Sequence, residues 1–161
     1  VKEWSEQGQD CDYSQMVIDA EKSSCESMID VSDSRFTAPQ SMAKAICDYC
    51  AETKQDLPET QGDYMRLVCQ SLAAEYAKIK QELEQSVGRK IKTIYIVGGG
   101  SQNGLLNKMT AQKTGCKVIA GPVEATAIGN IKVQAQASGE LSKDNPLRLK
   151  GKGMELKTFL P

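Results

Sequence analysis

The stretch that decides the fold is Ile91-Lys92-Thr93-Ile94-Tyr95-Ile96-Val97-Gly98-Gly99-Gly100-Ser101-Gln102-Asn103. Its first seven residues are rich in β-branched and apolar side chains, which predicts a short strand buried on both faces. Three glycines follow, and glycine lets the backbone turn sharply or lets a ligand approach without meeting a Cβ atom. A strand, a glycine turn and a following helix together predict an α/β fold.

The same order of elements repeats after the turn. The spacing of apolar residues, together with the glycines that close each helix, predicts a helix over 103–114, a strand over 117–120 and a helix over 123–138. Two strands joined through a helix form a right-handed parallel crossover. Residues 140–161 have the pattern of a loop with a weak helix or an extended tail. We therefore predict a helix-rich domain with a short, mainly parallel sheet.

The residues before the strand predict helices. Apolar side chains spaced by three or four positions predict an amphipathic helix over 63–87, and Gly88 stands where helices commonly end in a left-handed glycine. The predicted buried face of this helix is Met65, Val68, Cys69, Leu72, Tyr76, Ile79, Leu83 and Val87. Shorter helical patterns occur in residues 1–30 and 41–53, with polar loops between them.

Composition limits the chemistry that is open to the chain. The 161 residues include no histidine, which excludes Ser-His-Asp and Cys-His catalysis and histidine-containing zinc sites. Twenty basic and 21 acidic residues give a net charge of −1, which supplies no reason to bind nucleic acid or an anionic membrane. The longest uncharged stretch, 93–107, holds too many glycines and polar residues for a membrane span. We expect neither nucleic acid nor membrane as a partner.

Six cysteines are present, and Cys47 and Cys50 have C-x-x-C spacing. A redox pair usually opens a helix after a strand, whereas this pair lies inside a helical pattern. Without histidine or a second C-x-x-C pair, a zinc site is also poorly supported. We predict packed core thiols, and the absence of a secretory signal predicts a cytoplasmic protein.

The glycine turn is the candidate site. Backbone N–H groups and the positive end of a helix dipole favour a phosphate group at such a turn. Ser101 could instead simply cap the following helix.

Two other functions stay open on these residues. Gly98, Gly100 and Gly104 have the spacing G-x-G-x-x-x-G, and Glu124 could bind a ribose hydroxyl of NAD in a dinucleotide-binding domain. An acidic residue at a helix start is, however, favoured by the helix dipole alone. The long helix over 63–87 could also belong to a non-enzymatic helical interaction module.

Two glycine-bearing blocks carry a family resemblance. They are Ile96-Val97-Gly98-Gly99-Gly100-Ser101-Gln102-Asn103-Gly104-Leu105-Leu106-Asn107 and Val118-Ile119-Ala120-Gly121-Pro122-Val123-Glu124-Ala125-Thr126-Ala127-Ile128-Gly129-Asn130. Together they resemble the FGGY family of carbohydrate kinases, and shorter matches at 36–42, 58–62, 71–73 and 156–161 extend the resemblance over nearly the whole chain. The second block is similar to members that phosphorylate the ketose L-rhamnulose at its 1-hydroxyl in rhamnose breakdown. The resemblance thus implies a transferase that uses ATP, with Mg²⁺ as companion ion.

The resemblance also implies a site. Gly98, Gly99 and Gly100 would admit the adenosine and the α-phosphate of ATP, with Gly99 the favoured position. Asn103 and Gln102 would face the adenine or the ribose. No residue of the chain is assigned as a metal ligand.

The resemblance implies two actin-like (ribonuclease-H-like) ATPase domains that close over a cleft, of which residues 1–161 are a partial, truncated C-terminal domain. Gly121 and Glu124 would support the rim of the nucleotide pocket. The catalytic aspartate, the sugar-binding residues and the N-terminal domain of the family have no match here, so we assign no catalytic residue and expect the chain alone to be inactive. A strand over 91–97 without its preceding neighbours would have an unpaired edge, so we expect self-association or marginal stability.

Overall fold

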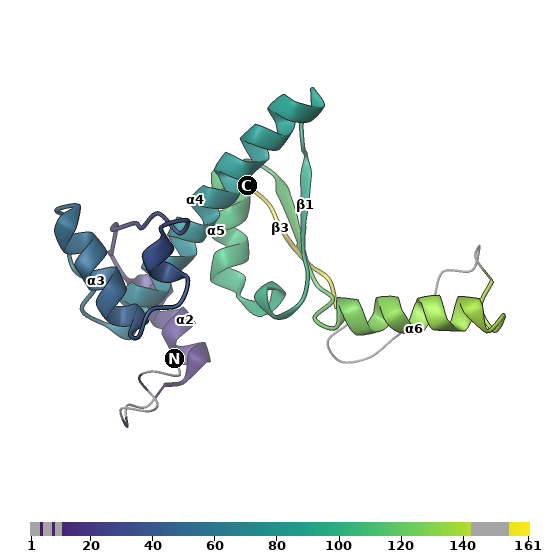
Figure 1. The fold of residues 1–161 in the computed structure, drawn as a ribbon, viewed down its shortest axis with the longest axis horizontal. Helices are drawn as coiled ribbons and strands as arrows, with labels where there is room; N and C mark the ends of the chain where they lie inside the picture. Colours follow the sequence, from purple (N-terminus) through teal and green to yellow (C-terminus); the bar gives the residue numbers. More distant parts are fainter. Residues whose placement is uncertain (1–3, 5–7, 9–10, 143–154) are drawn as a thin grey trace. The chain divides into compact units, whose positions relative to one another are not determined.

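The computed structural model describes residues 4, 8, 11–142 and 155–161. The chain forms two compact units, Val1–Arg89 and Lys90–Pro161, each of which is described by itself (Figure 1). The predicted loop over 140–161 lies partly outside the described residues.

The first unit is built from helices, as the sequence predicts. They are α2 (Tyr13–Lys22), α3 (Met42–Glu52) and α4 (Gln61–Val87), with a 3-10 turn, η1 (Ser34–Phe36), between α2 and α3. The side chain of Ser41 caps α3 by accepting a hydrogen bond from the backbone N–H of Lys44. These helices confirm the predicted helical segments, although α4 begins two residues before the predicted start.

Both ends of α4 have local chemical causes. At its start Thr60 and Asp63 form a capping box, in which each side chain accepts a hydrogen bond from the backbone N–H of the other residue. At its end Gly88 adopts a left-handed conformation with φ of 66°. The predicted helix end is therefore confirmed, together with the reason for it.

The core of this unit joins α3 to the first half of α4. Ile46 and Cys50 of α3 meet Leu67 of α4, and all three are at most 2% exposed. Partly buried side chains pack around them, namely Cys25, Ile29, Phe36, Tyr64 and Val68. Figure 1 shows α2 and α3 beside the N-terminal part of α4.

The predicted buried face of α4 is wrong in its C-terminal half. Ile79, Leu83 and Val87 are 42%, 49% and 53% exposed. The other helices of this unit lie along the first part of α4, so helical spacing alone does not bury its last turns.

The second unit contains a three-stranded sheet. In chain order its elements are β1 (Thr93–Ile96), η2 (Gly99–Gln102), α5 (Gly104–Thr114), β2 (Lys117–Ala120), α6 (Ala125–Ala137) and β3 (Lys157–Phe159). The strand order is β1-β2-β3, with β1 and β2 parallel in the register Thr93 to Lys117. Strand β3 runs antiparallel to β2, and Phe159 lies opposite Val118.

The sheet is therefore mixed, not mainly parallel. The parallel pair and the α/β class agree with the sequence prediction, but β3 occupies a segment that was expected to be loop or tail. Its partner β2 lies about 40 residues earlier in the sequence. No local pattern reports such a distant pairing.

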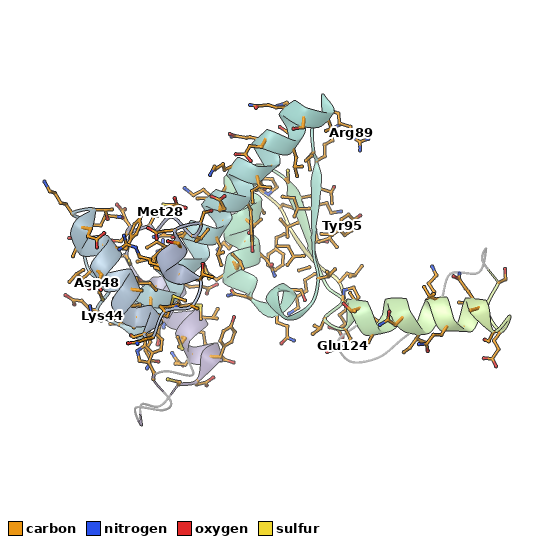
Figure 2. The ribbon with its side chains drawn as sticks, viewed as in Figure 1. Met28, Lys44, Asp48, Arg89, Tyr95 and Glu124 are labelled. Carbon is orange, nitrogen blue, oxygen red and sulfur yellow. The ribbon has the colours of Figure 1, made fainter. Side chains whose placement is uncertain are left out.

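Strand β1 also differs from the expectation of burial on both faces. Tyr95 is 67% exposed, and Figure 2 shows its side chain on β1. Within the described part of the chain β1 pairs with β2 alone, so its other edge is open. This edge is the feature from which self-association is expected, and that association stays a prediction.

Helix α5 packs against β2 and β3 and makes the core of the second unit. Its buried apolar residues are Leu105, Leu106 and Ala111, and those of β2 are Val118 and Ala120. The turns that follow β1 and β2 therefore begin at a sheet that is packed against α5.

Candidate functional site

The glycine turn after β1 is closed by its own hydrogen bonds. Gly98 has φ of 75° and ψ of −162°, a conformation that favours glycine. Its carbonyl accepts hydrogen bonds from the backbone N–H of Ser101 at 3.1 Å and from the Ser101 hydroxyl at 2.6 Å. Ser101 thus closes the turn and does not cap α5.

The glycines do not lead directly into α5. The 3-10 turn η2 lies between Gly98 and the helix, and Asn103 is the N-cap of α5. The side-chain oxygen of Asn103 accepts a hydrogen bond from the backbone N–H of Leu106 at 3.0 Å. One of the backbone N–H groups at the start of α5 is therefore already bonded to the chain itself and is not free for a ligand. This differs from the simple phosphate site expected there.

A second turn, after β2, lies against the first. The backbone N–H of Gly98 donates to the carbonyl of Pro122 at 3.2 Å, and that of Gly121 donates to the carbonyl of Ile96 at 2.8 Å. Gly121 has φ of 113°, and a Cβ atom on it would clash with the backbone oxygen of Glu155. Only glycine fits at this position without moving the segment that leads into β3.

Beside these turns is an open cleft with a volume of about 550 Å³. It is lined by Ser101, Gln102, Ala120, Gly121, Val123, Glu124, Glu155 and Lys157. Figure 2 shows Glu124 where the chain enters α6. Clefts of roughly 300–1,000 Å³ are typical of small-molecule sites.

The structure brings some of the predicted site residues together and leaves others apart. Gln102 lies on the wall of the cleft. Gly99 and Gly100 are exposed in η2, before the lining residues, and a Cβ atom at Gly99 would have nothing within 4 Å. Gly98 is half-buried under the same turn. Asn103 is 7% exposed and does not line the cleft, so its contact with a ligand stays a prediction.

Other lining residues were not predicted from the sequence. Lys157 lies in the segment that was expected to be loop or tail, but β3 places it on the cleft wall with Glu155 two residues before it. The available signal was the pair of β-favouring residues Thr158 and Phe159, which is too short to predict a strand. The cleft thus holds two carboxylates and one ammonium group. Carboxylates suit hydroxyl and amino donors, and the ammonium group suits a phosphate.

The cysteines of the C-x-x-C pair lie in and beside the core of the first unit. All six cysteines are outside disulfides. Cys50 is 0% exposed, and this burial raises the pKa of its thiol. The Cys47 sulfur lies 2.9 Å from the hydroxyl of Tyr64. Packing in the core is thereby confirmed for Cys50, and Cys47 is half-buried beside it.

The described residues have neither a candidate metal cluster nor a membrane-spanning helix. They contain no group of three or more His, Cys, Asp or Glu side chains that could hold a metal ion. None of the helices in the same residues is long and apolar enough to cross a membrane.

One known protein family matches the part of the chain that contains both glycine turns. The C-terminal domain of the FGGY family of carbohydrate kinases matches residues 1–138. The chain belongs to this family. The FGGY C-terminal domain is an actin-like ATPase domain, which accounts for an α/β unit with a glycine turn at the end of a strand. Family membership leaves the dinucleotide-binding and interaction-module alternatives without support.

Curated FGGY relatives are similar over most of the chain. The rhamnulokinase of Bacteroides thetaiotaomicron is 40% identical over 156 residues, which is 94% of this chain and 32% of that protein. The rhamnulokinase of Lactiplantibacillus plantarum is 43% identical over 134 residues, 83% of this chain and 28% of that protein. The chain thus spans about a third of the length of these relatives.

Proposed function

We propose that this chain supplies the nucleotide-binding side of a kinase that transfers phosphate from ATP to the 1-hydroxyl of L-rhamnulose. The nucleotide-binding part of this proposal rests on the cleft beside the two glycine turns. Support for the sugar comes from the relatives, which are about 40% identical and are rhamnulokinases. The whole reaction is assigned to a kinase of which these residues form one part.

The lining residues support an orientation for the nucleotide. We propose that the exposed backbone at Gly99 receives the adenosine and the α-phosphate, because no Cβ atom blocks the approach there. The carboxylate of Glu124 would accept hydrogen bonds from ribose hydroxyls, and the ammonium group of Lys157 would pair with a phosphate. Gln102 can both donate and accept, which suits the edge of adenine.

The proposed reaction is a direct phosphoryl transfer. The sugar oxygen O1 forms a bond to the γ-phosphorus, the bond from that phosphorus to the β–γ bridging oxygen breaks, and ADP leaves. The hydroxyl proton passes to a base. The proposal places that base outside residues 1–161, because none of their acidic residues matches the catalytic aspartate of the family. What this chain contributes is positioning of the nucleotide, on which phosphoryl transfer mostly depends.

Mg²⁺ belongs to the proposal as a companion of ATP. The described residues hold no cluster suited to a metal ion. Mg²⁺ is commonly bound through substrate phosphates and one or two carboxylates, with water completing its shell. It would therefore arrive with the nucleotide, and no residue of this chain is assigned to it. A cytoplasmic location is proposed because all six cysteines are free thiols, which is usual for proteins of a reducing compartment.

An amide NMR titration of the 161-residue chain with Mg-ATP tests the nucleotide site. We expect shifts confined to residues 98–103 and to the second turn at 121–124, and no response to NAD. A response to NAD that depends on Glu124, or silence with both nucleotides, would contradict the assignment of the cleft.

A coupled assay for ADP release tests the assignment of the base. The chain alone is expected to leave L-rhamnulose unphosphorylated. Turnover by the purified chain would show that a base lies within residues 1–161, and the proposed division of roles would be wrong.

A further inference from the structure

Asn107 is a fully buried polar residue beneath the glycine turn. It lies on α5 and is 0% exposed. Its side-chain Nδ2 donates a hydrogen bond to the backbone carbonyl of Ser101 at 2.9 Å. Its Oδ1 is the one buried side-chain oxygen or nitrogen in the described residues that has no hydrogen-bond partner.

Packing does not explain an asparagine at this place. The other buried residues of α5 either are apolar or, like Thr110 and Thr114, donate their hydroxyl hydrogen bonds within the helix. Leucine has a similar shape to asparagine and would leave no buried oxygen without a partner. An unpartnered buried oxygen loses its hydration and gains no bond in return. Such a group calls for another reason to be present, and the bond from Nδ2 supplies one.

That bond connects α5 to the wall of the cleft. Ser101 and Gln102 both line the cleft, and they belong to η2, a single 3-10 turn. The turn has local backbone hydrogen bonds of its own, from the N–H of Ser101 to the carbonyl of Gly98 and from the N–H of Asn103 to that of Gly100. The Asn107 amide adds a bond from the helix to the carbonyl of Ser101, six residues earlier. It thereby fixes η2 relative to α5.

We propose that Asn107 is a positioning residue of the nucleotide site, which holds η2 so that Ser101 and Gln102 stay on the wall of the cleft. The residue itself is 0% exposed and is not among the residues that line the cleft. The consequence for nucleotide binding rests on the proposed function, whereas the consequence for the turn does not.

The test compares Asn107→Leu with a matched control, Thr110→Val, in the 161-residue chain. Thr110 is also 0% exposed on α5, and its hydroxyl donates only within the helix, to the carbonyl of Leu106 at 2.7 Å. Both variants remove a buried side-chain donor from the same helix, but only Asn107→Leu removes the bond to the turn.

Amide hydrogen exchange measures the turn without any nucleotide. In Asn107→Leu we expect the amides of Ser101 and Asn103 to exchange about tenfold faster than in the unsubstituted chain, a change of about 1.4 kcal/mol. The amide of Gly115, which donates to Ala111 at the far end of α5, should keep its rate. Thr110→Val should leave the amides of the turn unchanged. Equal rates in the turn for Asn107→Leu and the unsubstituted chain would overturn the proposal.

Mg-ATP titration then measures the consequence for binding. We expect a Kd about tenfold higher for Asn107→Leu and an unchanged Kd for Thr110→Val. Loosened turn amides with an unchanged Kd would refute the positioning role in binding. If the unsubstituted chain does not bind Mg-ATP, the proposed function fails, while hydrogen exchange still decides the role of Asn107 in the turn.

A second variant covers the case in which Asn107→Leu does not fold. In Asn107→Asp a protonated carboxyl can donate to the Ser101 carbonyl, whereas an ionised carboxylate cannot. We expect exchange at the Ser101 amide, corrected for intrinsic rates, to become slower as this carboxyl is protonated. The same correction applied to Gly115 should remove all pH dependence. A Ser101 amide with the same corrected protection at every pH would overturn the proposal.

Discussion

The substitution Gly99→Ala should change the stability of the fold and the affinity for nucleotide in opposite directions. A Cβ atom at Gly99 would have nothing within 4 Å, and its φ is not in the left-handed region. The native backbone therefore accepts alanine without strain. Alanine also restricts the unfolded chain, so the free energy of unfolding should rise by about 0.4–1 kcal/mol.

The effect on nucleotide binding should have the opposite sign. If the adenosine and α-phosphate approach the backbone at Gly99, the added methyl group occupies space that the ligand needs. Inserting a methyl group into a packed contact typically costs about 1–3 kcal/mol. This corresponds to a Kd for Mg-ATP that is roughly 5- to 150-fold higher. A more stable protein that binds ATP less well is a result that general damage to the fold cannot produce.

Urea unfolding and Mg-ATP titration by NMR measure the two quantities on the same samples. Gly98→Ala is the matched control, because its Cβ atom also meets nothing within 4 Å but its φ is +75°. With ψ of −162° this backbone conformation is almost restricted to glycine and costs alanine about 1–3 kcal/mol, so this variant should be less stable. A Gly99→Ala variant with normal stability and an unchanged Kd would refute the placement of the nucleotide at this turn.

Three further predictions concern the first unit. Gly62→Ala should lower the free energy of unfolding in urea by about 1–2 kcal/mol, because its Cβ atom would lie 2.9 Å from atoms of α2, and this overpacking outweighs the gain in helix propensity. Asp63→Asn should make the free energy of unfolding depend less on pH at acid pH. The hydroxyl of Ser23 above all lowers the pKa of the Asp63 carboxyl below its usual 3.8. The stability that this carboxylate contributes is therefore present above pH 3.8 and is lost as the pH falls through the lowered pKa. Cys50 should resist alkylation at neutral pH in the native chain and react after denaturation, as followed by mass spectrometry, because it is buried and its thiol pKa is raised.

Each of these has a result that would contradict it. Gly129→Ala adds the same methyl group in α6, where nothing lies within 4 Å, and should not destabilise the chain; an equal loss in both variants would mean that the contact with α2 is irrelevant. If the free energy of unfolding fell equally with pH in Asp63→Asn and in the unsubstituted chain, this carboxyl would have no role in acid stability. Rapid native alkylation of Cys50 would show that it is not a core thiol.

Local structure followed from the sequence where local chemistry determines it. The end of α4 at Gly88 and the bounds of β2 at Lys117–Ala120 were predicted correctly. A left-handed glycine and a short β-branched run act over a few residues, so their signal is contained in the sequence itself. The glycine turn was located for the same reason, although η2 intervenes before α5.

The cleft could be predicted only in part. Gln102 was implied by the family resemblance, and Glu124 by the dinucleotide-like spacing and by the resemblance; the structure puts both on the cleft wall. Lys157 and Glu155 escaped prediction because their place depends on β3 pairing with β2 across a long loop. Asn107 escaped it too, because an asparagine in a helical pattern gives no sign of whether it is buried.

The sequence by itself determined the chemistry that is available: no histidine, two glycine turns after β strands, and helices with defined ends. These depend on residue type and short spacing, which are present in any conformation of the chain. Only the tertiary structure decided that the turns lie side by side, that β3 makes the sheet mixed, and that Asn107 reaches Ser101. Such contacts join residues that are distant in sequence or depend on which face of an element is covered, and both are settled only when the chain packs.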